Sequence, residues 1–215
     1  MSATNRGSDR QKDDYYSTPP WAVDIILPHL RIDLNSDKTI LSPAAGKGEI
    51  IKRLVNYGVN PSQIEGIEIN KERADEAQKY TNKKVLCGDA IQIMRKWNNR
   101  DDLQLIIDNP PYKLVDTYAY RCLKLVGYGT DKYFWNGLPV VALLTNVSFL
   151  FGRERVNFWK KYPATIYLLS RRPSFFTKWV ISKKTGKLTK ISNDATNYVW
   201  VVWDQYYSNT WNILD

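Results

Sequence analysis

LQLIIDNPPY, the stretch from Leu103 to Tyr112, joins a short apolar run to a turn that contains two consecutive prolines. The run at residues 103–107 predicts a β-strand that ends at the turn. Two prolines stiffen the turn and remove two amide donors, which leaves carbonyl oxygens free to face a ligand. A strand that ends in a polar or glycine-bearing turn also occurs three times before Leu103, so the stretch belongs to a repeated arrangement.

Strands and helices alternate on both sides of this stretch. Strands are predicted at residues 39–41, 64–68, 84–87 and 140–144, and helices at residues 21–30, 49–57, 71–80, 90–97 and 153–161. Two prolines precede the first helix, where a missing amide donor costs little. Strands that alternate with helices require a parallel sheet with helices on both faces. The predicted fold class is therefore α/β.

The end of the chain departs from this alternation. Residues 165–169 and 198–203 have strand patterns, and no helical pattern lies between them. A lysine-rich stretch with Lys184-Thr185-Gly186-Lys187 separates them and predicts a hairpin turn. The last two strands are therefore expected to pair antiparallel. One domain is predicted over residues 15–215, after a polar leader at residues 1–14 that is expected to be disordered, with short insertions near residues 126–139 and 182–194.

Composition limits the classes of function. The chain has 215 residues, 43% of them hydrophobic, and no apolar run long enough to span a membrane or resemble a signal peptide. Two cysteines and one histidine argue against a disulfide framework or a zinc site, so no metal is expected, and both cysteines are expected to be buried thiols of a reduced cytoplasm. Residues 1–108 carry 16 basic and 16 acidic side chains, whereas residues 109–215 carry 15 and 6. This basic half is consistent with a polyanion partner or with a merely cationic surface.

Candidate ligand-binding residues stand at the carboxyl ends of the predicted strands, where open parallel sheets bind ligands. The turn Ser42–Gly48 contains glycines that allow a ligand close approach to the backbone and that open a helix. Glu68 follows Gly46 by 22 residues, the spacing of an acid that binds a ribose diol. Asp89 can accept a hydrogen bond from an adenine amino group or cap the helix that follows it. A solvated strand-end acid is an equally good interpretation of Glu68.

The turn Asn109–Tyr112 has a chemical logic of its own. The amide oxygen of Asn109 and a proline carbonyl are acceptors for the two hydrogens of an amino group, and Tyr112 offers a flat face to a base. The alternative is a rigid loop after a strand. Asp108 is expected to point away from the Asn109 side, because neighbouring side chains of a strand face opposite ways.

These motifs resemble those of the class I, Rossmann-like S-adenosylmethionine-dependent methyltransferases, and among them the adenine-N6 amino-methyltransferases of small phage type. The resemblance implies a seven-stranded, mostly parallel sheet with an antiparallel last strand, helices on both faces, and S-adenosylmethionine as cofactor. It departs at Ser42, where the family commonly has an acidic or amide residue. It implies a catalytic loop of Asn109, Pro110, Pro111 and Tyr112. The cofactor-binding residues that it implies are Tyr16, Thr18, Pro19, Ser42, Pro43, Ala44, Gly46, Gly48, Glu68, Asp89, Ala90 and Asn109.

The reaction that the resemblance implies is methylation of the exocyclic amino group of adenine in DNA, with the base turned out of its stack. Asn109 and the Pro110 carbonyl would accept the hydrogens of the amine, Tyr112 would stack on the base, and Phe175 or Phe176 would cover its other face. Phe175 and Phe176 have core packing as an equally good interpretation. Residues expected to bind nucleic acid are Lys113, Arg153, Arg155, Arg171, Arg172, Phe175, Phe176, Lys178, Lys183, Lys184, Lys187 and Lys190.

Several alternatives remain open from the sequence. An RNA adenine methyltransferase would need the same residues. A protein methyltransferase acting on a glutamine amide could use the same tetrapeptide, although such enzymes usually carry a recognition domain that is not visible here. Cytosine amino-methyltransferases generally have serine in place of Asn109. A catalytically silent nucleic-acid-binding protein with the same fold is a further alternative, supported by Ser42 alone.

Overall fold

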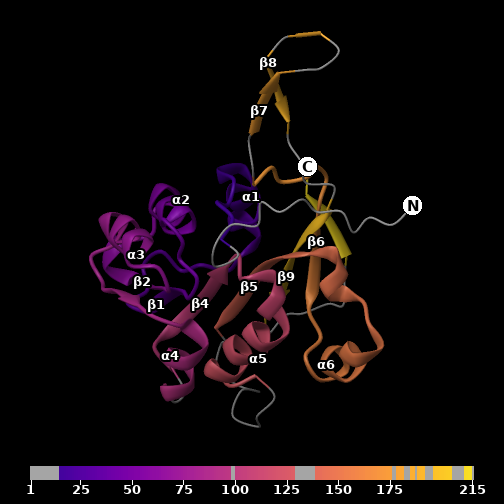
Figure 1. Cartoon of the computed structure of the whole chain (residues 1–215). Helices are drawn as coiled ribbons and strands as arrows, with labels where there is room; N and C mark the ends of the chain where they lie inside the picture. The colour runs from indigo at the N-terminus through magenta and orange to yellow at the C-terminus, as the bar shows by residue number, and fades with distance from the viewer. Residues whose placement is uncertain are drawn as a thin grey trace.

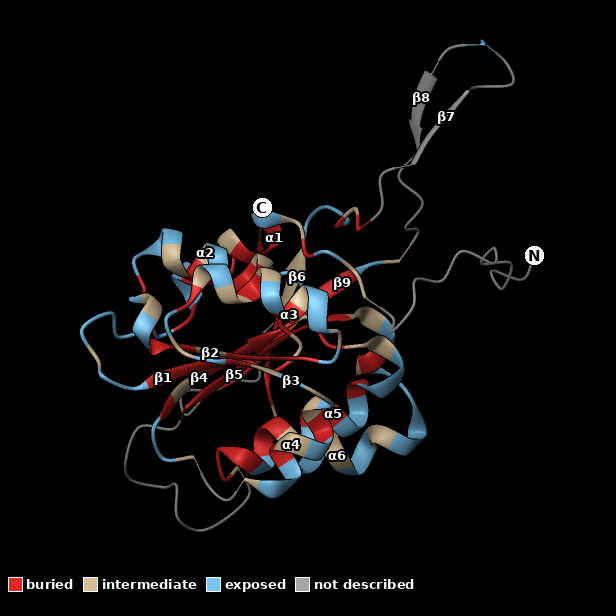
Figure 2. Cartoon of the chain, turned by 60° about the vertical axis from the view of Figure 1, so that its left-hand side comes forward, coloured by how far each residue is buried: buried red, intermediate tan, exposed pale blue. Residues whose placement is uncertain are grey.

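A computed structural model describes residues 15–97, 100–128, 139–175, 178–181, 185–186, 188–191, 196–204 and 211–214. A twisted sheet lies at the centre of the molecule, and helices cover both of its faces (Figure 1). In Figure 2, α1, α2 and α3 lie on one side of the buried strands, and α4, α5 and α6 lie on the other. The fold is therefore a three-layer α/β arrangement, as the alternation of strands and helices predicts.

The central sheet has eight strands in the order β10-β6-β9-β5-β4-β1-β2-β3. Its strands are β1 (Thr39–Ser42), β2 (Ile64–Glu68), β3 (Val85–Cys87), β4 (Leu103–Asp108), β5 (Val140–Asn146), β6 (Thr165–Leu169), β9 (Tyr198–Trp203) and β10 (Trp211–Leu214). All neighbours pair in parallel except β9, which is antiparallel to both β5 and β6. The expected mostly parallel sheet with an antiparallel strand near its end is confirmed, and β10 adds a strand at the edge.

The direction of strand order reverses between β1 and β4. From β1 the chain continues outward to β2 and β3, whereas β4 returns to the other side of β1 and the order continues to β5. In parallel sheets a ligand cleft forms beside such a reversal, at the carboxyl ends of the strands. The residues that follow β1 and β4 are Pro43 and Asn109, so the glycine-bearing turn and the diproline turn meet at this point.

A separate hairpin consists of β7 (Lys178–Ile181) and β8 (Leu188–Ile191), which pair antiparallel. It stands clear of the layered body in Figure 1. The hairpin predicted around residues 184–187 is therefore present. Lys183, Lys184 and Lys187 and most of the two predicted insertions lie outside the described residues, as do the leader at residues 1–14 and Phe176.

Helices and 3-10 turns connect the strands. The α-helices are α1 (Pro20–Asp24), α2 (Glu49–Tyr57), α3 (Lys71–Ala77), α4 (Ala90–Lys96), α5 (Val115–Leu125) and α6 (Val156–Lys161). The 3-10 turns are η2 (Leu27–His29), η3 (Pro61–Gln63), η4 (Gln78–Tyr80), η5 (Tyr112–Leu114), η7 (Val147–Leu150) and η8 (Arg153–Arg155). Side chains of Asn70 and Asp89 cap α3 and α4 by accepting hydrogen bonds from the Arg73 and Gln92 amides at 3.0 and 3.1 Å.

Two hydrophobic clusters fill the space between the sheet and the helices. Ile40, Leu105 and Ile107 belong to the cluster beneath α1, α2 and α3, and Leu41 and Ile106 belong to the cluster beneath α4, α5 and α6. Consecutive residues of one strand thus face opposite layers, and both layers are covered. The strands at the centre are consequently apolar on both faces, as is typical of parallel sheets.

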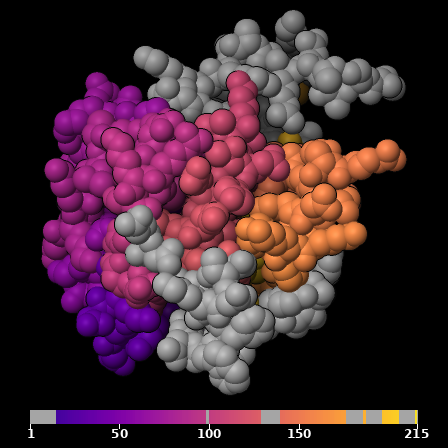
Figure 3. Space-filling view, turned by 90° about the horizontal axis from the view of Figure 1, so that it is seen from below, coloured from indigo at the N-terminus to yellow at the C-terminus, as the bar shows by residue number. Residues whose placement is uncertain are grey.

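Three details differ from the sequence prediction. The predicted helix at residues 21–30 is divided into α1 and η2, because Pro28 cannot continue a helical hydrogen-bond ladder. Helix α5 was not predicted, although it fills the space between α4 and α6 in Figure 3. Cys122 is buried as expected, whereas Cys87 is exposed, so the expectation of two buried thiols is wrong for Cys87. No helix among the described residues is long and apolar enough to cross a membrane.

Candidate active site

A cavity of about 430 Å³ opens at the carboxyl ends of β1 to β4. This volume is within the range of sites for small molecules and cofactors. Its wall includes these predicted ligand-binding residues: Tyr16, Thr18, Pro43, Ala44, Gly46, Glu68, Asp89, Ala90, Asn109, Pro111 and Lys113. The sequence motifs, which are far apart along the chain, therefore meet around one cavity.

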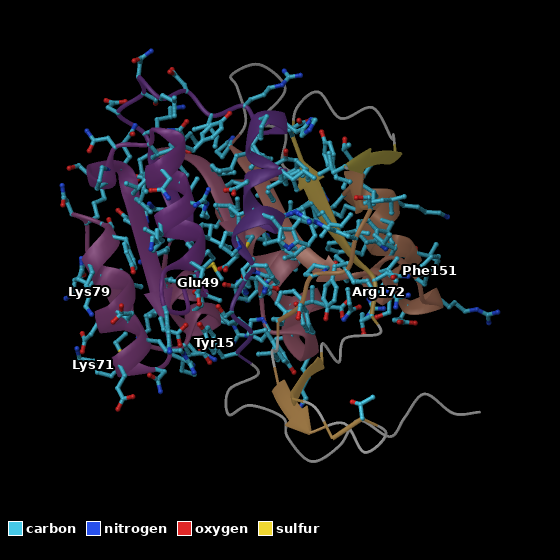
Figure 4. All side chains as sticks on the ribbon, turned by 90° about the horizontal axis from the view of Figure 1, so that it is seen from above. Tyr15, Glu49, Lys71, Lys79, Phe151 and Arg172 are labelled. Atoms are coloured by element: carbon cyan, nitrogen blue, oxygen red, sulfur yellow. The ribbon has the colours of Figure 1, made fainter. Side chains whose placement is uncertain are left out.

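Gly46 lies where only a glycine fits. Its φ is +57°, in the left-handed region, and a Cβ there would come within 2.7 Å of the Tyr15 ring. Tyr15 donates a hydrogen bond to Glu49, and Figure 4 shows the two side chains converging from the N-terminal segment and α2. Tyr15 and Glu49 both line the cavity. The absence of a side chain at Gly46 thus allows the Tyr15 ring to pack directly against the loop after β1.

Glu68 ties three parts of the cavity together. One carboxylate oxygen accepts from the Gly46 amide at 2.9 Å, and the other accepts from the Asn70 amide at 2.9 Å. Arg73 from α3 forms an ion pair with the same carboxylate at 2.7 Å. Glu68 is 5% exposed. Glu68 at this point suits a ligand that presents hydroxyl donors. Asp89 is exposed at the cavity wall, and it caps α4 as well as lining the cavity.

The Asn109 side chain is fixed in orientation by its neighbours. Its amide nitrogen donates to Thr18 Oγ1 at 3.1 Å and to the Tyr16 carbonyl oxygen at 3.4 Å. A carbonyl oxygen can only accept, so the amide nitrogen must face it and Oδ1 must face the other way. Oδ1 accepts a hydrogen bond from the Tyr112 hydroxyl at 2.9 Å. Asn109 thus presents an oriented acceptor at the edge of the cavity.

Tyr112 belongs to an aromatic cluster beside the cavity. Its ring is stacked on Tyr16, with centroids 5.5 Å apart and planes at 19°, and it meets Phe175 at 65°. Phe175 is 7% exposed and belongs to the core, in agreement with the alternative interpretation of core packing. Tyr16 is the ring that stacks on Tyr112. Neither Tyr112 nor Pro110 is part of the cavity wall itself.

Asp108 is the principal departure from the predicted site. Its carboxylate accepts hydrogen bonds from the Ala44 amide, the Asn109 amide and the Tyr118 hydroxyl, and it lines the cavity. The expectation that it points away from the Asn109 side is therefore wrong. Because both faces of β4 are buried, the alternation of side chains did not separate a core face from a ligand face. Tyr15, Glu49, Arg73 and Tyr118 also line the cavity and were not predicted.

Three further predicted ligand residues lie outside the cavity wall. Ser42 is fully buried at the end of β1, and its hydroxyl has no hydrogen-bond partner among the residues that the structure describes. Gly48 has a φ of +86° and precedes α2, where a Cβ would come within 2.9 Å of the Ala77 Cα of α3. Gly48 is thus required for the close contact between the start of α2 and α3. Pro19 precedes α1 as the residue before its first turn.

The arginines expected to bind nucleic acid have different surroundings. Arg153 is exposed on η8, whereas Arg155 forms an ion pair with Asp116 of α5 at 2.5 Å. Arg171 lies 4.2 Å from the centre of the Trp21 ring, and Arg172, labelled in Figure 4, donates to Asn197 at 2.8 Å. Arg171 and Arg172 are exposed and remain accessible to a phosphate. No group of three potential metal ligands occurs among the described residues.

No family model and no curated protein matches the sequence. Among solved structures, the fold is similar to a type I restriction-modification system methyltransferase subunit from Streptococcus thermophilus, at 13% identity and a TM-score of 0.61, over 92% of this chain and 47% of that one. It is similar to a SAM-dependent O-methyltransferase from Thermotoga maritima, at 14% and 0.53, over 88% and 67%. It also resembles the 23S rRNA methyltransferase ErmE, at 11% and 0.54, over 91% and 72%.

These likenesses establish the fold, which is the Rossmann-like fold of S-adenosylmethionine-dependent methyltransferases. The chain spans about half the length of the restriction-modification subunit. S-adenosylmethionine is the cofactor that the sequence motifs imply, and the cavity can be compared with its chemistry. Glu68 and Asp89 present carboxylate acceptors at the cavity wall for hydroxyl and amino groups, and Gly46 lines the cavity with backbone alone. The residues present therefore fit this cofactor.

Proposed function

We propose that the protein transfers a methyl group from S-adenosylmethionine to the N6 amino group of adenine in DNA. The observation that carries this proposal is the fixed orientation of Asn109 at the cavity edge. Thr18 and Tyr16 hold its amide nitrogen, so that Oδ1 is the atom presented to an incoming donor. An amine with two hydrogens is the kind of nucleophile that such an acceptor can orient.

The exocyclic nitrogen of adenine is a poor nucleophile because its lone pair is delocalised into the ring. In the proposed mechanism, Asn109 Oδ1 accepts one of its hydrogens and the Pro110 carbonyl accepts the other. Both acceptors hold the amine so that the lone pair becomes localised on nitrogen, with no strong base required. The gain comes from positioning and from dipoles that are oriented before the reaction. S-adenosylmethionine, when bound, would supply the methyl group as an electrophilic sulfonium substituent: the methyl–sulfur bond breaks as the methyl–nitrogen bond forms, the sulfur keeps the electron pair, and one amine proton leaves to solvent.

The aromatic cluster supports an extruded base as the substrate. The Tyr112 hydroxyl now occupies Asn109 Oδ1, and Tyr16 covers one face of the Tyr112 ring. A target amine takes the place of that hydroxyl, and the base stacks on Tyr112 as the tyrosine rotates from Asn109. Stacking on an aromatic ring contributes roughly 1–3 kcal/mol for each base. The substrate thus replaces the hydrogen bond that Tyr112 donates to Asn109 in the ligand-free protein.

The charge distribution supports a nucleic acid as the polymer that carries the base. The excess of basic over acidic side chains lies entirely in residues 109–215, which contain the hairpin, Arg171 and Arg172. Lysine and arginine contacts with phosphates supply most of the affinity that does not depend on sequence. Similar folds include a restriction-modification subunit and an rRNA methyltransferase, so DNA and RNA are both substrates to test.

The experiment incubates the protein with methyl-labelled cofactor and, in turn, duplex DNA, single-stranded DNA, RNA and a mixture of unmodified proteins. We expect label in DNA, and at least 100-fold less transfer by the Asn109→Ala variant, the usual scale for losing a transition-state hydrogen-bonding group. Asn146→Ala is the matched control, because Asn146 ends the neighbouring strand β5 outside the cavity wall. Label in protein alone, or full activity without Asn109, would contradict the proposal, and label in RNA alone would change the substrate to RNA.

A further inference from the structure

Asp108 is an acid enclosed in the cavity wall, and its hydrogen-bond partners among the described residues are neutral. It ends β4 and has no exposed surface. The amides of Ala44 and Asn109 and the hydroxyl of Tyr118 donate hydrogen bonds to its carboxylate, the last two at 2.8 and 2.9 Å. Burial raises the pKa of Asp108 to about 7, against the lowering effect of those three donors. The site therefore holds an acid without a positively charged partner.

The cations of the cavity wall do not supply that charge. Arg73 is already paired with Glu68 at 2.7 Å, and Lys113 is exposed on η5 and forms no ion pair with Asp108. Among the described residues no lysine or arginine forms an ion pair with Asp108. A buried carboxylate without a counter-ion is costly, and a cationic ligand in the adjoining cavity would remove that cost.

The neighbouring strand β1 ends in an uncharged residue, Ser42, rather than in an acid. Strands β1 and β4 pair in parallel with Leu41 opposite Ile106, so Ser42 and Asp108 end adjacent strands. Ser42 has no charge, and its buried hydroxyl has no hydrogen-bond partner within the described part of the chain. Ser42 is the position at which this chain departs from the motif, where the family commonly has an acidic or amide residue. The acid at this end of the cavity is supplied by β4 instead.

We propose that the Asp108 carboxylate, which is covered in the ligand-free protein, attracts the α-ammonium group of S-adenosylmethionine to this end of the cavity by its charge and so selects ligands that carry the amino-acid chain. This inference rests on the cofactor assignment of the proposed function. The ammonium is the better partner than the sulfonium, because a carboxylate set against the sulfonium methyl would compete with the substrate amine for it.

The test compares three ligands by calorimetry. S-adenosylmethionine and S-adenosylhomocysteine both carry the ammonium, and only the first carries the sulfonium. 5′-Methylthioadenosine has the same adenine and ribose and lacks the amino-acid chain. We expect Asp108→Asn to weaken binding of the first two by about 10- to 100-fold, the scale of removing one charge that faces a ligand charge at short range. Its affinity for 5′-methylthioadenosine should change by less than about twofold.

Asp89→Asn is the matched control, because Asp89 lines the same cavity at the end of β3 and should affect all three ligands alike. An equal loss for all three ligands in Asp108→Asn would mean that Asp108 only holds the Ala44 loop, and would overturn the inference. A loss confined to S-adenosylmethionine would assign Asp108 to the sulfonium and overturn it as well. If wild-type protein binds none of the three, the cofactor assignment fails and the inference fails with it.

A second measurement uses the wild-type protein alone, in case the variant does not fold. At pH 6 the Asp108 carboxyl is largely protonated, and pairing with an ammonium should ionise it. Glu68 of β2 and Tyr118 and Cys122 of α5 are the other titratable groups that interact with it. Calorimetry in two buffers of different ionisation enthalpy should show release of about one proton with S-adenosylhomocysteine and none with 5′-methylthioadenosine. Equal proton release for both ligands would contradict the inference.

Discussion

The Tyr112 hydroxyl distinguishes the ligand-free site from a site that is ready to bind the target amine. It donates to Asn109 Oδ1 at 2.9 Å, the atom proposed to accept a hydrogen of the target amine. The ring and the hydroxyl of Tyr112 thus have different effects. The ring supplies stacking, and the hydroxyl competes with the substrate. Substitutions that remove one and keep the other distinguish these effects.

Tyr112→Phe should keep the rate constant kcat within about threefold of wild type, since the stacking face remains and only a competing hydrogen bond is lost. Tyr112→Ala should lower kcat/KM by roughly 10- to 100-fold, because a stacking contribution of about 1–3 kcal/mol disappears. Steady-state kinetics on adenine-containing DNA measures both. If Tyr112→Phe is as impaired as Tyr112→Ala, the hydroxyl takes part in the reaction and the stacking account is incorrect.

Asp108 should make stability depend on pH in the absence of ligand. Burial raises its pKa from 3.8 to about 7, so between these values the folded protein binds a proton more tightly than the unfolded chain. The free energy of unfolding should therefore fall as pH rises through this window. The shift corresponds to about 4 kcal/mol as an upper value. Glu68, Tyr118 and Cys122 are the other titratable groups that face this carboxyl.

Denaturant unfolding of wild type and Asp108→Asn across that window provides the measurement. The advantage of wild type over the variant should shrink as pH rises from about 4 to about 7, because the neutral amide does not titrate. A difference between the two proteins that stays constant with pH would contradict the assignment of a neutral buried carboxyl.

At the residue scale, the sequence predicted Glu68, Asp89 and Asn109 at the cavity because their spacing follows the ends of strands. Asp108 was assigned to the opposite side by the alternation of strand side chains. That rule fails here because β4 is enclosed on both faces and Asp108 is its last residue, where the chain already turns toward Ala44. Tyr16 was expected to contact the cofactor, and its stacking on Tyr112 depends on contacts between distant segments that no local pattern contains.

At the scale of elements, the β7–β8 hairpin and the helix α5 illustrate opposite outcomes. The hairpin was predicted from its turn residues, which act locally. Helix α5 was overlooked even though Val115, Tyr118, Ala119 and Cys122 are all buried and recur at helical spacing. Its start follows the diproline turn through η5 without a capping side chain, so no polar signal marked its first residue. The turn residues therefore predicted the hairpin, whereas the helix without a capping side chain was not predicted.

The lysines between β7 and β8 are predicted to contact DNA phosphates. Replacing Lys183, Lys184 and Lys187 with alanine should weaken DNA binding and lower the slope of log affinity against log salt by roughly 2 to 3, since each phosphate contact contributes about 0.9. Fluorescence anisotropy at several salt concentrations measures the slope. The triple variant of Lys52, Lys71 and Lys79 is the charge-matched control on α2 to η4. An unchanged slope in the hairpin variant would remove this segment from the DNA interface.

At the scale of the whole molecule, the fold explains why distant motifs meet. Strand order reverses between β1 and β4, and the residues after both strands enclose one cavity. The α/β class and its antiparallel strand follow from the pattern of the sequence. The edge strand β10 does not, because Trp211–Leu214 is short and pairs with β6, far away in the chain. Pairing of this kind depends on the completed sheet rather than on local preference.

The identity of the methylated product tests the central claim most directly. Duplex DNA is incubated with the protein and S-adenosylmethionine, digested to nucleosides and analysed by mass spectrometry. An acceptor pair that orients an exocyclic amine at the cavity edge predicts N6-methyl-2′-deoxyadenosine as the product. Methyl groups on a ring carbon or on cytosine, or DNA that stays unmodified while the cofactor is bound, would contradict it.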